Sequence, residues 1–116
     1  MIAGIDGHNL IIEGIAGHEG TTPIELKRDA LAASAELIFL TENMAKKSKS
    51  AVATIGSTQV EPNLFNIIPK RVVFSLEIRA GDNSNRLRLG SDLKKKIPFV
   101  TEKRGVKFSL KKNYEK

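Results

Sequence analysis

The sequence contains no cysteine, which excludes disulfides, zinc–thiolate sites, iron–sulfur clusters and thiol nucleophiles. It also lacks a long uninterrupted apolar run, because Glu13, Glu36 and Glu42 break the most apolar stretches, so no membrane span is expected. The start of the chain lacks the basic segment and small-residue cleavage pattern of a signal peptide. These absences together predict a cytoplasmic protein.

The groups that hydrolytic catalysis requires are missing as well. A hydrolase needs a nucleophile with a base, or a metal with several ligands. The only histidines, His8 and His18, would lie about 30 Å apart in an extended segment and could not share a metal. The glycines are not accompanied by the lysine–serine pair or the helix-opening GxGxxG of a phosphate-binding loop. We therefore expect no metal, no cofactor and no activity in the isolated chain, with His8 a surface histidine.

What is present suits one globular domain spanning residues 1–116. The chain is 41% apolar and shows no internal repeat or linker. Its net charge of +6 is concentrated in residues 82–116, where eleven Lys and Arg stand against four Asp and Glu, while residues 1–81 sum to −1. Such a patch could attract nucleic acid or an acidic partner. We interpret its two lysine groups as solvated faces; they are Lys94, Lys95 and Lys96, and Lys107, Lys111 and Lys112.

Two elements are predicted in the first half of the chain. Residues 9–16 are β-branched and apolar between glycines, which indicates a strand. Thr22, Pro23 and Glu25 form a capping box, which predicts that a helix begins at Thr22. Small and apolar residues then recur at helical spacing until the polar run at 46–50, which favours a helix lying close on a sheet.

The second half predicts two further strands, a second helix and a last strand. Residues 51–60 read as a strand, and residues 71–79 alternate, with Val72, Phe74, Leu76 and Ile78 on an apolar face and Arg79 on the open face. Leu89, Leu93 and Ile97 predict a second helix, which Pro98 should kink or end near Ile97. Residues 106–111 alternate as a last strand.

The resulting β-α-β-β-α-β order predicts an α+β fold. Its economical form is a ferredoxin-like four-stranded antiparallel sheet, with two helices covering one face.

One motif indicates a functional site. In Gly17-His18-Glu19-Gly20-Thr21-Thr22-Pro23, a histidine lies in a glycine-flanked bend just before the predicted helix N-terminus. Such a histidine could be offered to a ligand beside free backbone donors. It could equally be a turn histidine that forms only local hydrogen bonds, and spacing leaves both interpretations open.

Several blocks in the chain resemble a known family. The segment GIAGHEGTTPIELKRDALAASAELI (14–38) resembles the entry into the lid domain of the metal-dependent N-carbamoyl-L-amino-acid hydrolase and allantoate amidohydrolase family, the hydantoinase/carbamoylase amidases. VATIG (52–56), NIIP (66–69) and RVVFSLEIR (71–79) resemble the family's next blocks in the same order. The resemblance covers nearly the whole chain.

The resemblance implies a bilobed enzyme that cleaves a C–N bond in N-carbamoyl amino acids, allantoate or similar ureido or amide acids. A catalytic domain with two divalent metal ions, manganese or zinc, would be interrupted by this lid domain. The lid would pair with its copy in a homodimer and close over the active site. The metal ligands are then expected outside residues 1–116, so that the chain is a domain excised from a larger enzyme.

Three residues match motif positions of the family. The resemblance implies that His18 reaches across the dimer and donates to the developing oxyanion in the partner's site. It also implies that Asn66 and Arg79 hold the substrate's carboxylate, a role that suits the guanidinium fork. The chain departs from the family pattern at Glu19, Lys70 and Pro98. A carboxylate at Glu19 could raise the pKa of His18 and favour its donating form.

Two other functions are compatible with this element order. An RNA-binding module would need aromatic side chains on the open sheet face, whereas Phe74 and Phe108 fall on the predicted core face, so no nucleic acid is expected. A free-standing dimerising domain for a small ligand or for regulation would use the same sheet. It would not need His18, Asn66 and Arg79 together.

Overall fold

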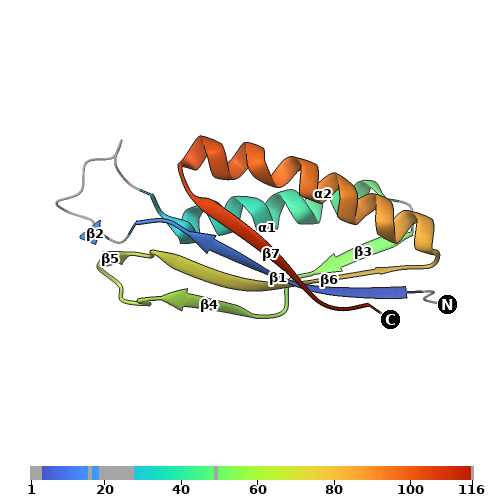
Figure 1. The fold of residues 1–116 in the computed structure, drawn as a ribbon, viewed down its shortest axis with the longest axis horizontal. Coiled ribbons are helices and arrows are strands. Elements are labelled where there is room, and N and C mark those ends of the chain that lie inside the picture. Colours follow the sequence, from blue (N-terminus) through green and yellow to red (C-terminus); the bar gives the residue numbers. More distant parts are fainter. Residues whose placement is uncertain (1–3, 16, 19–27, 49, 116) are drawn as a thin grey trace.

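The computed structural model describes residues 4–15, 17–18, 28–48 and 50–115. The elements in chain order are β1 (Gly4–Glu13), β2 (Gly17–His18), α1 (Ala30–Lys47), β3 (Ala51–Thr54), β4 (Thr58–Glu61), β5 (Ile67–Ile68), β6 (Arg71–Ala80), α2 (Asn83–Arg104) and β7 (Lys107–Glu115). Both helices lie on the same face of the main sheet, which gives two layers (Figure 1). The predicted α+β fold with β-α-β-β-α-β order is confirmed.

The main sheet is antiparallel and has the strand order β3-β6-β1-β7, with β4 also pairing with β6. β3 pairs with residues 77–80 of β6 and β4 with residues 71–74, so the two short strands share one edge. Between them, the hydroxyl of Ser75 accepts hydrogen bonds from the backbone of Gly56 and Ser57 at 3.1 and 3.0 Å. The predicted strand 51–60 therefore forms as two strands, and five strands occupy the four predicted positions.

Alternation along β6 puts every second side chain under the helices. Val72, Phe74 and Ile78 are buried in the core that the helices close, as predicted from the sequence. From β1, Leu10 and Ile12 join the same core. The burial of this apolar surface is the main stabilising contribution to the fold.

The predicted helix is not continuous from Thr22, because Arg28 and Asp29 are not helical. α1 starts at Ala30, where the carboxylate of Asp29 accepts hydrogen bonds from the backbone of Leu31 and Ala32 at 2.9 and 3.1 Å. Arg28 is held in extended geometry instead, because its carbonyl accepts a hydrogen bond from the backbone of Ile15 at 2.9 Å. The capping box predicted at residues 22–25 lies outside the described residues.

The second helix does not end at Ile97. α2 runs through Pro98 to Arg104 and ends at Gly105, which adopts the left-handed conformation. Pro98 has no N–H to donate to the carbonyl of Lys94, so the helix continues without that one backbone hydrogen bond. Buried Leu93, Ile97 and Val100 hold both sides of the proline against the sheet.

The two helices are also joined at their outer surface by Glu36 of α1. Its carboxylate accepts hydrogen bonds from Lys103 at 2.6 Å and from Arg104 at 2.7 Å. These hydrogen bonds lower the pKa of Glu36. The C-terminal turn of α2 is thereby fixed to the middle of α1.

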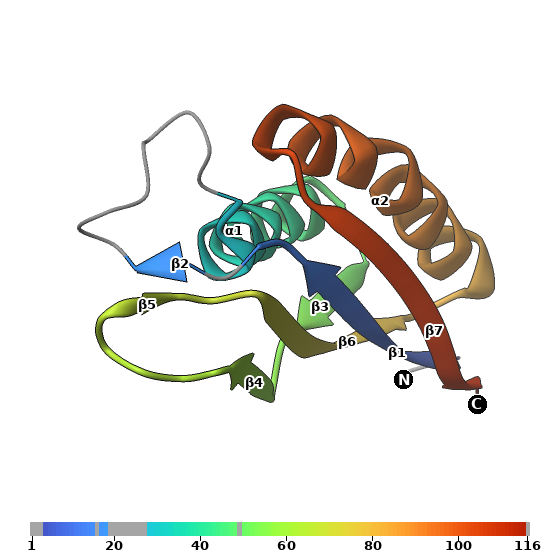
Figure 2. The ribbon, with the colours of Figure 1, turned by 60° about the vertical axis from the view of Figure 1, so that its left-hand side comes forward.

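The first strand also starts earlier than predicted, at Gly4 instead of residue 9, and it ends at Glu13. Its first half pairs with β6 on one side and with the end of β7 on the other, so that Asp6 lies opposite Glu115. The described ends of the chain therefore lie side by side at one end of the sheet (Figure 2).

Candidate functional site

His18 lies on β2, a two-residue strand that forms a small separate sheet with β5. In this antiparallel pair, Gly17 lies opposite Ile68 and His18 opposite Ile67. The segment before it is fixed by two backbone hydrogen bonds, from Gly14 to the carbonyl of Lys70 at 2.7 Å and from Ile15 to that of Arg28. The backbone of His18 thus lies beside the residue that directly follows Asn66.

Asn66 is half-buried in the tight turn before β5, where the backbone N–H of Ile67 donates to the carbonyl of Leu64 at 3.4 Å. The neighbouring Phe65 is 98% exposed, and Leu64 is also exposed. The fold brings two of the three predicted site residues, His18 and Asn66, to the same end of the domain.

A surface depression of about 560 Å³ adjoins this turn. Its lining is largely apolar and comes from the segment around β5 and the start of α1, including Leu31, Leu64, Phe65 and Ile68. Exposed apolar side chains that lie close together are typical of surfaces that contact another protein or a second domain. The His18 and Asn66 end therefore carries an apolar surface as well as two polar motif residues.

Arg79 lies elsewhere. It is on the open face of β6, eight residues from Arg71 and therefore about 26 Å from the end of β6 that follows β5. Its side chain is 44% exposed and forms an ion pair with Glu77 at 3.3 Å. The view in Figure 1 shows β5 at one end of the domain and the junction of β6 with α2 at the other. Within one chain, the fold does not bring Arg79 together with His18 and Asn66.

His8 is not the surface histidine that was predicted. It lies within β1 opposite Leu76, on the face covered by the helices, and it is only 7% exposed. Burial lowers its pKa, against a smaller opposing effect of Asp6. The sequence contained the signal for this, because Asp6 and His8 share the alternation of Leu10 and Ile12.

Sequence reasoning also missed the polar cluster around His8. Asp6 is 5% exposed and lies 3.3 Å from the guanidinium of Arg86, which is equally buried. Lys112 approaches the same carboxylate at 3.7 Å from β7. Arg86 was predictable as a helix residue but not as a buried one, because only the packing of α2 on the sheet directs its side chain inward.

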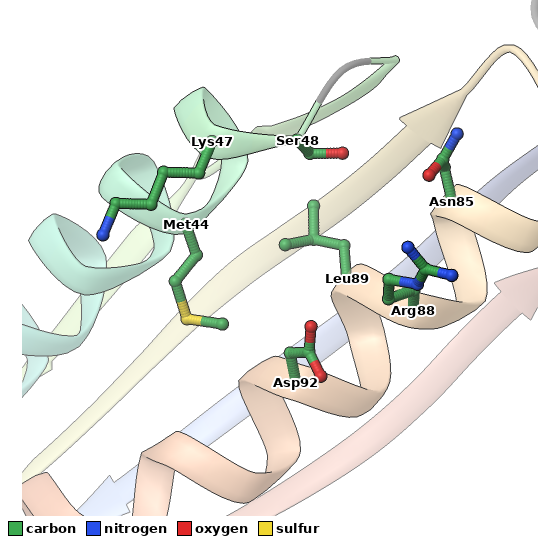
Figure 3. Close-up of a pocket in the computed structure, with 7 residues that line it drawn as sticks. All are labelled: Met44, Lys47, Ser48, Asn85, Arg88, Leu89 and Asp92. Atoms are coloured by element: carbon green, nitrogen blue, oxygen red, sulfur yellow. The ribbon is translucent and has the colours of Figure 1, made fainter.

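A second depression, shown in Figure 3, has a volume of about 430 Å³ and lies between the end of α1 and the first turns of α2. Seven residues line it: Met44, Lys47, Ser48, Asn85, Arg88, Leu89 and Asp92. Its charged side chains, Lys47, Arg88 and Asp92, are all exposed. It contains none of the three predicted site residues, and no buried polar group is aimed into it.

The metal and nucleic-acid predictions can be compared with the described part of the chain. Those residues contain no group of three or more His, Cys, Asp or Glu side chains that could hold a metal ion. The six lysines interpreted as solvated faces are exposed. Phe74 and Phe108 pack in or against the core, as predicted, and so are not available as stacking platforms on the open face. No helix among the described residues is long and apolar enough to cross a membrane.

Comparison with known proteins shows extensive similarity to one group of enzymes. The chain is 34% identical over 114 residues to an N-carbamoyl-L-amino-acid amidohydrolase of Pseudomonas sp. (strain NS671), covering 97% of this chain and 28% of that enzyme. It is 32% identical over 124 residues to allantoate deiminase 1 of Glycine max, covering 90% of this chain and 26% of that protein. No protein-family model matches the chain.

Solved structures show the same relationship. A hydantoinase/carbamoylase family amidase from Burkholderia multivorans matches with a TM-score of 0.91 and 26% identity, and one from Burkholderia ambifaria with 0.93 and 25%. Each match covers 97% of this chain and 28% of the other. The chain thus spans little more than a quarter of the length of the relatives that it matches.

Proposed function

We propose that this chain, which belongs to the hydantoinase/carbamoylase amidase family, is the lid and dimerisation domain of such an enzyme. Nearly the whole chain is homologous to a segment that makes up about 28% of the length of these amidases. The enzyme would cleave the C–N bond of an N-carbamoyl amino acid, allantoate or a similar ureido or amide acid. The observation that carries the proposal is the match of 97% of this chain, in fold and in sequence, to one segment that makes up 28% of each amidase.

The catalytic chemistry would come from the rest of that enzyme. The two divalent metal ions implied by the family do not fit the described residues of this domain, which offer no cluster of metal ligands. No step that uses a metal is therefore assigned to this chain. Its own contribution would be to bind the substrate, to supply a hydrogen-bond donor and to exclude water when the lid closes.

His18 would donate to the oxygen on which negative charge develops during attack at the scissile carbonyl. Such a donor stabilises the transition state by about 3 kcal/mol when it is preorganised. Asn66 would help to hold the carboxylate of the substrate in the same site, because β2 and β5 pair directly and hold the His18 and Asn66 backbone segments together. This pairing supports a shared role for the GHEGTTP and NIIP motifs.

Arg79 would bind the carboxylate of the substrate with its guanidinium group. Its distance from β5 along β6 means that Arg79 and His18 of one chain would serve different sites. In a two-fold symmetric dimer, one site would be completed by Arg79 of one chain together with His18 and Asn66 of its partner. The exposed apolar residues beside Asn66 support a contact surface at that end.

The test is the steady-state kinetics of Arg79→Ala in the full-length, metal-loaded enzyme, with N-carbamoyl amino acids and allantoate as substrates. Loss of charge-assisted hydrogen bonds worth about 2–3 kcal/mol should raise KM by roughly 30- to 150-fold. Arg71→Ala is the matched control, because Arg71 lies on the same open face of β6 in an exposed ion pair with Glu61. Its kinetics should stay near those of the parent.

Unchanged kinetics of Arg79→Ala in an active enzyme would remove the carboxylate-binding role of Arg79. If the gene that encodes this chain supplied no metal-binding catalytic domain, the proposal would fail as a whole. The remaining function would then be that of a free-standing dimerising domain that binds a small ligand or regulates a partner. A cytoplasmic location is part of the proposal and would be checked by cell fractionation.

A further inference from the structure

A cavity of about 270 Å³ lies between α2 and the strands β1, β6 and β7, near the end of the sheet where the chain ends lie together. It is on the helix-covered face, since Asp6 and His8 lie opposite the buried Ile78 and Leu76. Arg79 projects from the other face of β6. The cavity is therefore separate from the proposed amidase site.

Three polar side chains line this cavity while being more than nine-tenths buried: Asp6, His8 and Arg86. Asp6 and Arg86 form an ion pair at 3.3 Å. The Nδ1 atom of His8 has no hydrogen-bond partner among the described residues, and Oδ1 of Asp6 forms no hydrogen bond there beyond its ion-pair contacts. A buried nitrogen without a partner costs free energy that a bound group with a complementary oxygen would recover.

The charges around the cavity favour an anion. Arg86, Lys94 and Lys112 contribute three positive charges to its lining, and Asp6 contributes one negative charge. Asp6 lies close to both Arg86 and Lys112, and the formal charges of these four lining residues sum to a positive value. Burial lowers the pKa of His8, so its imidazole is neutral at neutral pH and can donate from Nδ1 in the appropriate tautomer.

The rest of the lining is apolar. Leu76, Leu93 and Ile97 contribute buried side chains from β6 and α2. A ligand that fits both the positively charged part and the apolar part of the lining has one anionic end and a short aliphatic body. The volume lies just below the usual range for ligand pockets, which restricts the ligand to a few carbon atoms.

We propose that this cavity binds a small aliphatic carboxylate, with the carboxylate held by His8 and Lys112 and the aliphatic body on Leu93 and Ile97. The ammonium groups of Lys94 and Lys112 lie on exposed side chains and can adjust to the ligand. Asp6 and Arg86 hold the floor of the cavity in place. Binding would link α2 to the two strands in which the described chain begins and ends.

The experiment is a titration of the chain with sodium isovalerate at constant ionic strength and pH 7.5, followed by the NMR signals of the imidazole Cε1–H groups. The sequence has only two histidines, so His8→Gln identifies the His8 signal by its disappearance. The His8 signal should shift along a saturable curve with a Kd of about 1–10 mM. Isovaleramide has the same shape without the charge and should produce no saturable shift.

Two lysine variants make the test specific. Lys112→Gln should weaken isovalerate binding about tenfold, because it removes a charge from the lining. Lys95→Gln removes an equivalent exposed charge that is not part of the lining, and it should leave the affinity unchanged. Amide spectra of both variants would confirm that they are folded.

Any of three results would overturn the proposal. One is the absence of saturation at about 50 mM isovalerate. Another is an equal response to isovaleramide, and the third is an affinity that Lys112→Gln leaves unchanged in a folded protein.

Discussion

His18 lies directly opposite Ile67 in the small sheet formed by β2 and β5, so the histidine motif and the asparagine motif meet at one end of the domain. Arg79 lies near the other end of β6. The same chain therefore cannot bring all three residues to one small substrate. This relationship leads to a specific expectation for mixed dimers.

Mixing full-length enzyme carrying His18→Ala with enzyme carrying Arg79→Ala should give a higher rate, at substrate concentrations below the parent KM, than either variant gives alone. In a mixed dimer, one site would receive the intact His18 from one chain and the intact Arg79 from the other. Random exchange of subunits should recover about a quarter of the parent rate, because half of the dimers are mixed and each has one complete site. The measurement is the initial rate after subunits have exchanged.

His18→Ala mixed with Asn66→Ala is the matched control, because both residues belong to the same end of one chain. In that mixed dimer each site keeps one of the two residues, so activity should remain at the level of the single variants. Recovery by the control pair, or none by the first pair, would contradict the shared site.

Gly14→Ala should strongly destabilise the fold. A Cβ atom at Gly14 would lie 1.8 Å from the carbonyl oxygen of Arg28, a backbone atom that cannot move without breaking the bridge to Ile15. We expect the free energy of unfolding to fall by about 2–4 kcal/mol in urea denaturation. At Gly56 the nearest atom to an added Cβ is the hydroxyl of Ser75 at 3.9 Å, so Gly56→Ala should change stability by about 0.5 kcal/mol or less. Equal effects of the two variants would show that the contact at Gly14 relaxes.

Pro98→Ala should stabilise the domain. α2 is already helical on both sides of Pro98, so alanine restores a backbone donor without requiring a new conformation. The gain should be about 1–3 kcal/mol, reduced by the packing lost with the half-buried ring. Ser91→Ala, at an exposed position of the same helix, should raise the free energy of unfolding by only a few tenths of a kcal/mol, about the difference in helix propensity between serine and alanine. A loss of stability in Pro98→Ala would mean that the ring's packing outweighs the restored hydrogen bond.

Stability should depend on pH through His8. Burial lowers its pKa in the folded state, so below the ordinary value of 6.5 the unfolded chain binds more protons than the folded one. The contribution of neutral His8 to the free energy of unfolding is complete above pH 6.5, and it is lost as the pH falls from 6.5 through the pKa of the folded state. The slope of the free energy of unfolding against pH should not exceed about 1.4 kcal/mol per pH unit, which is the limit for one proton. Urea denaturation between pH 5.5 and pH 7.5 should show this slope in the parent and a smaller one in His8→Gln. An identical slope in the variant would assign the effect to other groups.

Much of the fold was predictable because its signals are local. The alternation of Val72, Phe74, Leu76 and Ile78 fixed the two faces of β6, and the spacing of Leu89, Leu93 and Ile97 indicated α2. The errors came where distant parts of the chain compete with local preference. α1 starts at Ala30, after its N-cap Asp29, because the backbone of Ile15 holds Arg28 in extended geometry. α2 continues past Pro98 because apolar residues on both sides of it are buried.

The sequence by itself determined the element order, the apolar face of the sheet and the motifs that resemble the amidase family, because each depends on residues close together in the chain. Only the tertiary structure decided that His18 lies beside Asn66 and away from Arg79, since strand pairing and strand length set those distances. It alone decided that His8 and Asp6 are buried with Arg86. A side chain's environment depends on which element packs over it, and here that element is α2, more than seventy residues further along the chain.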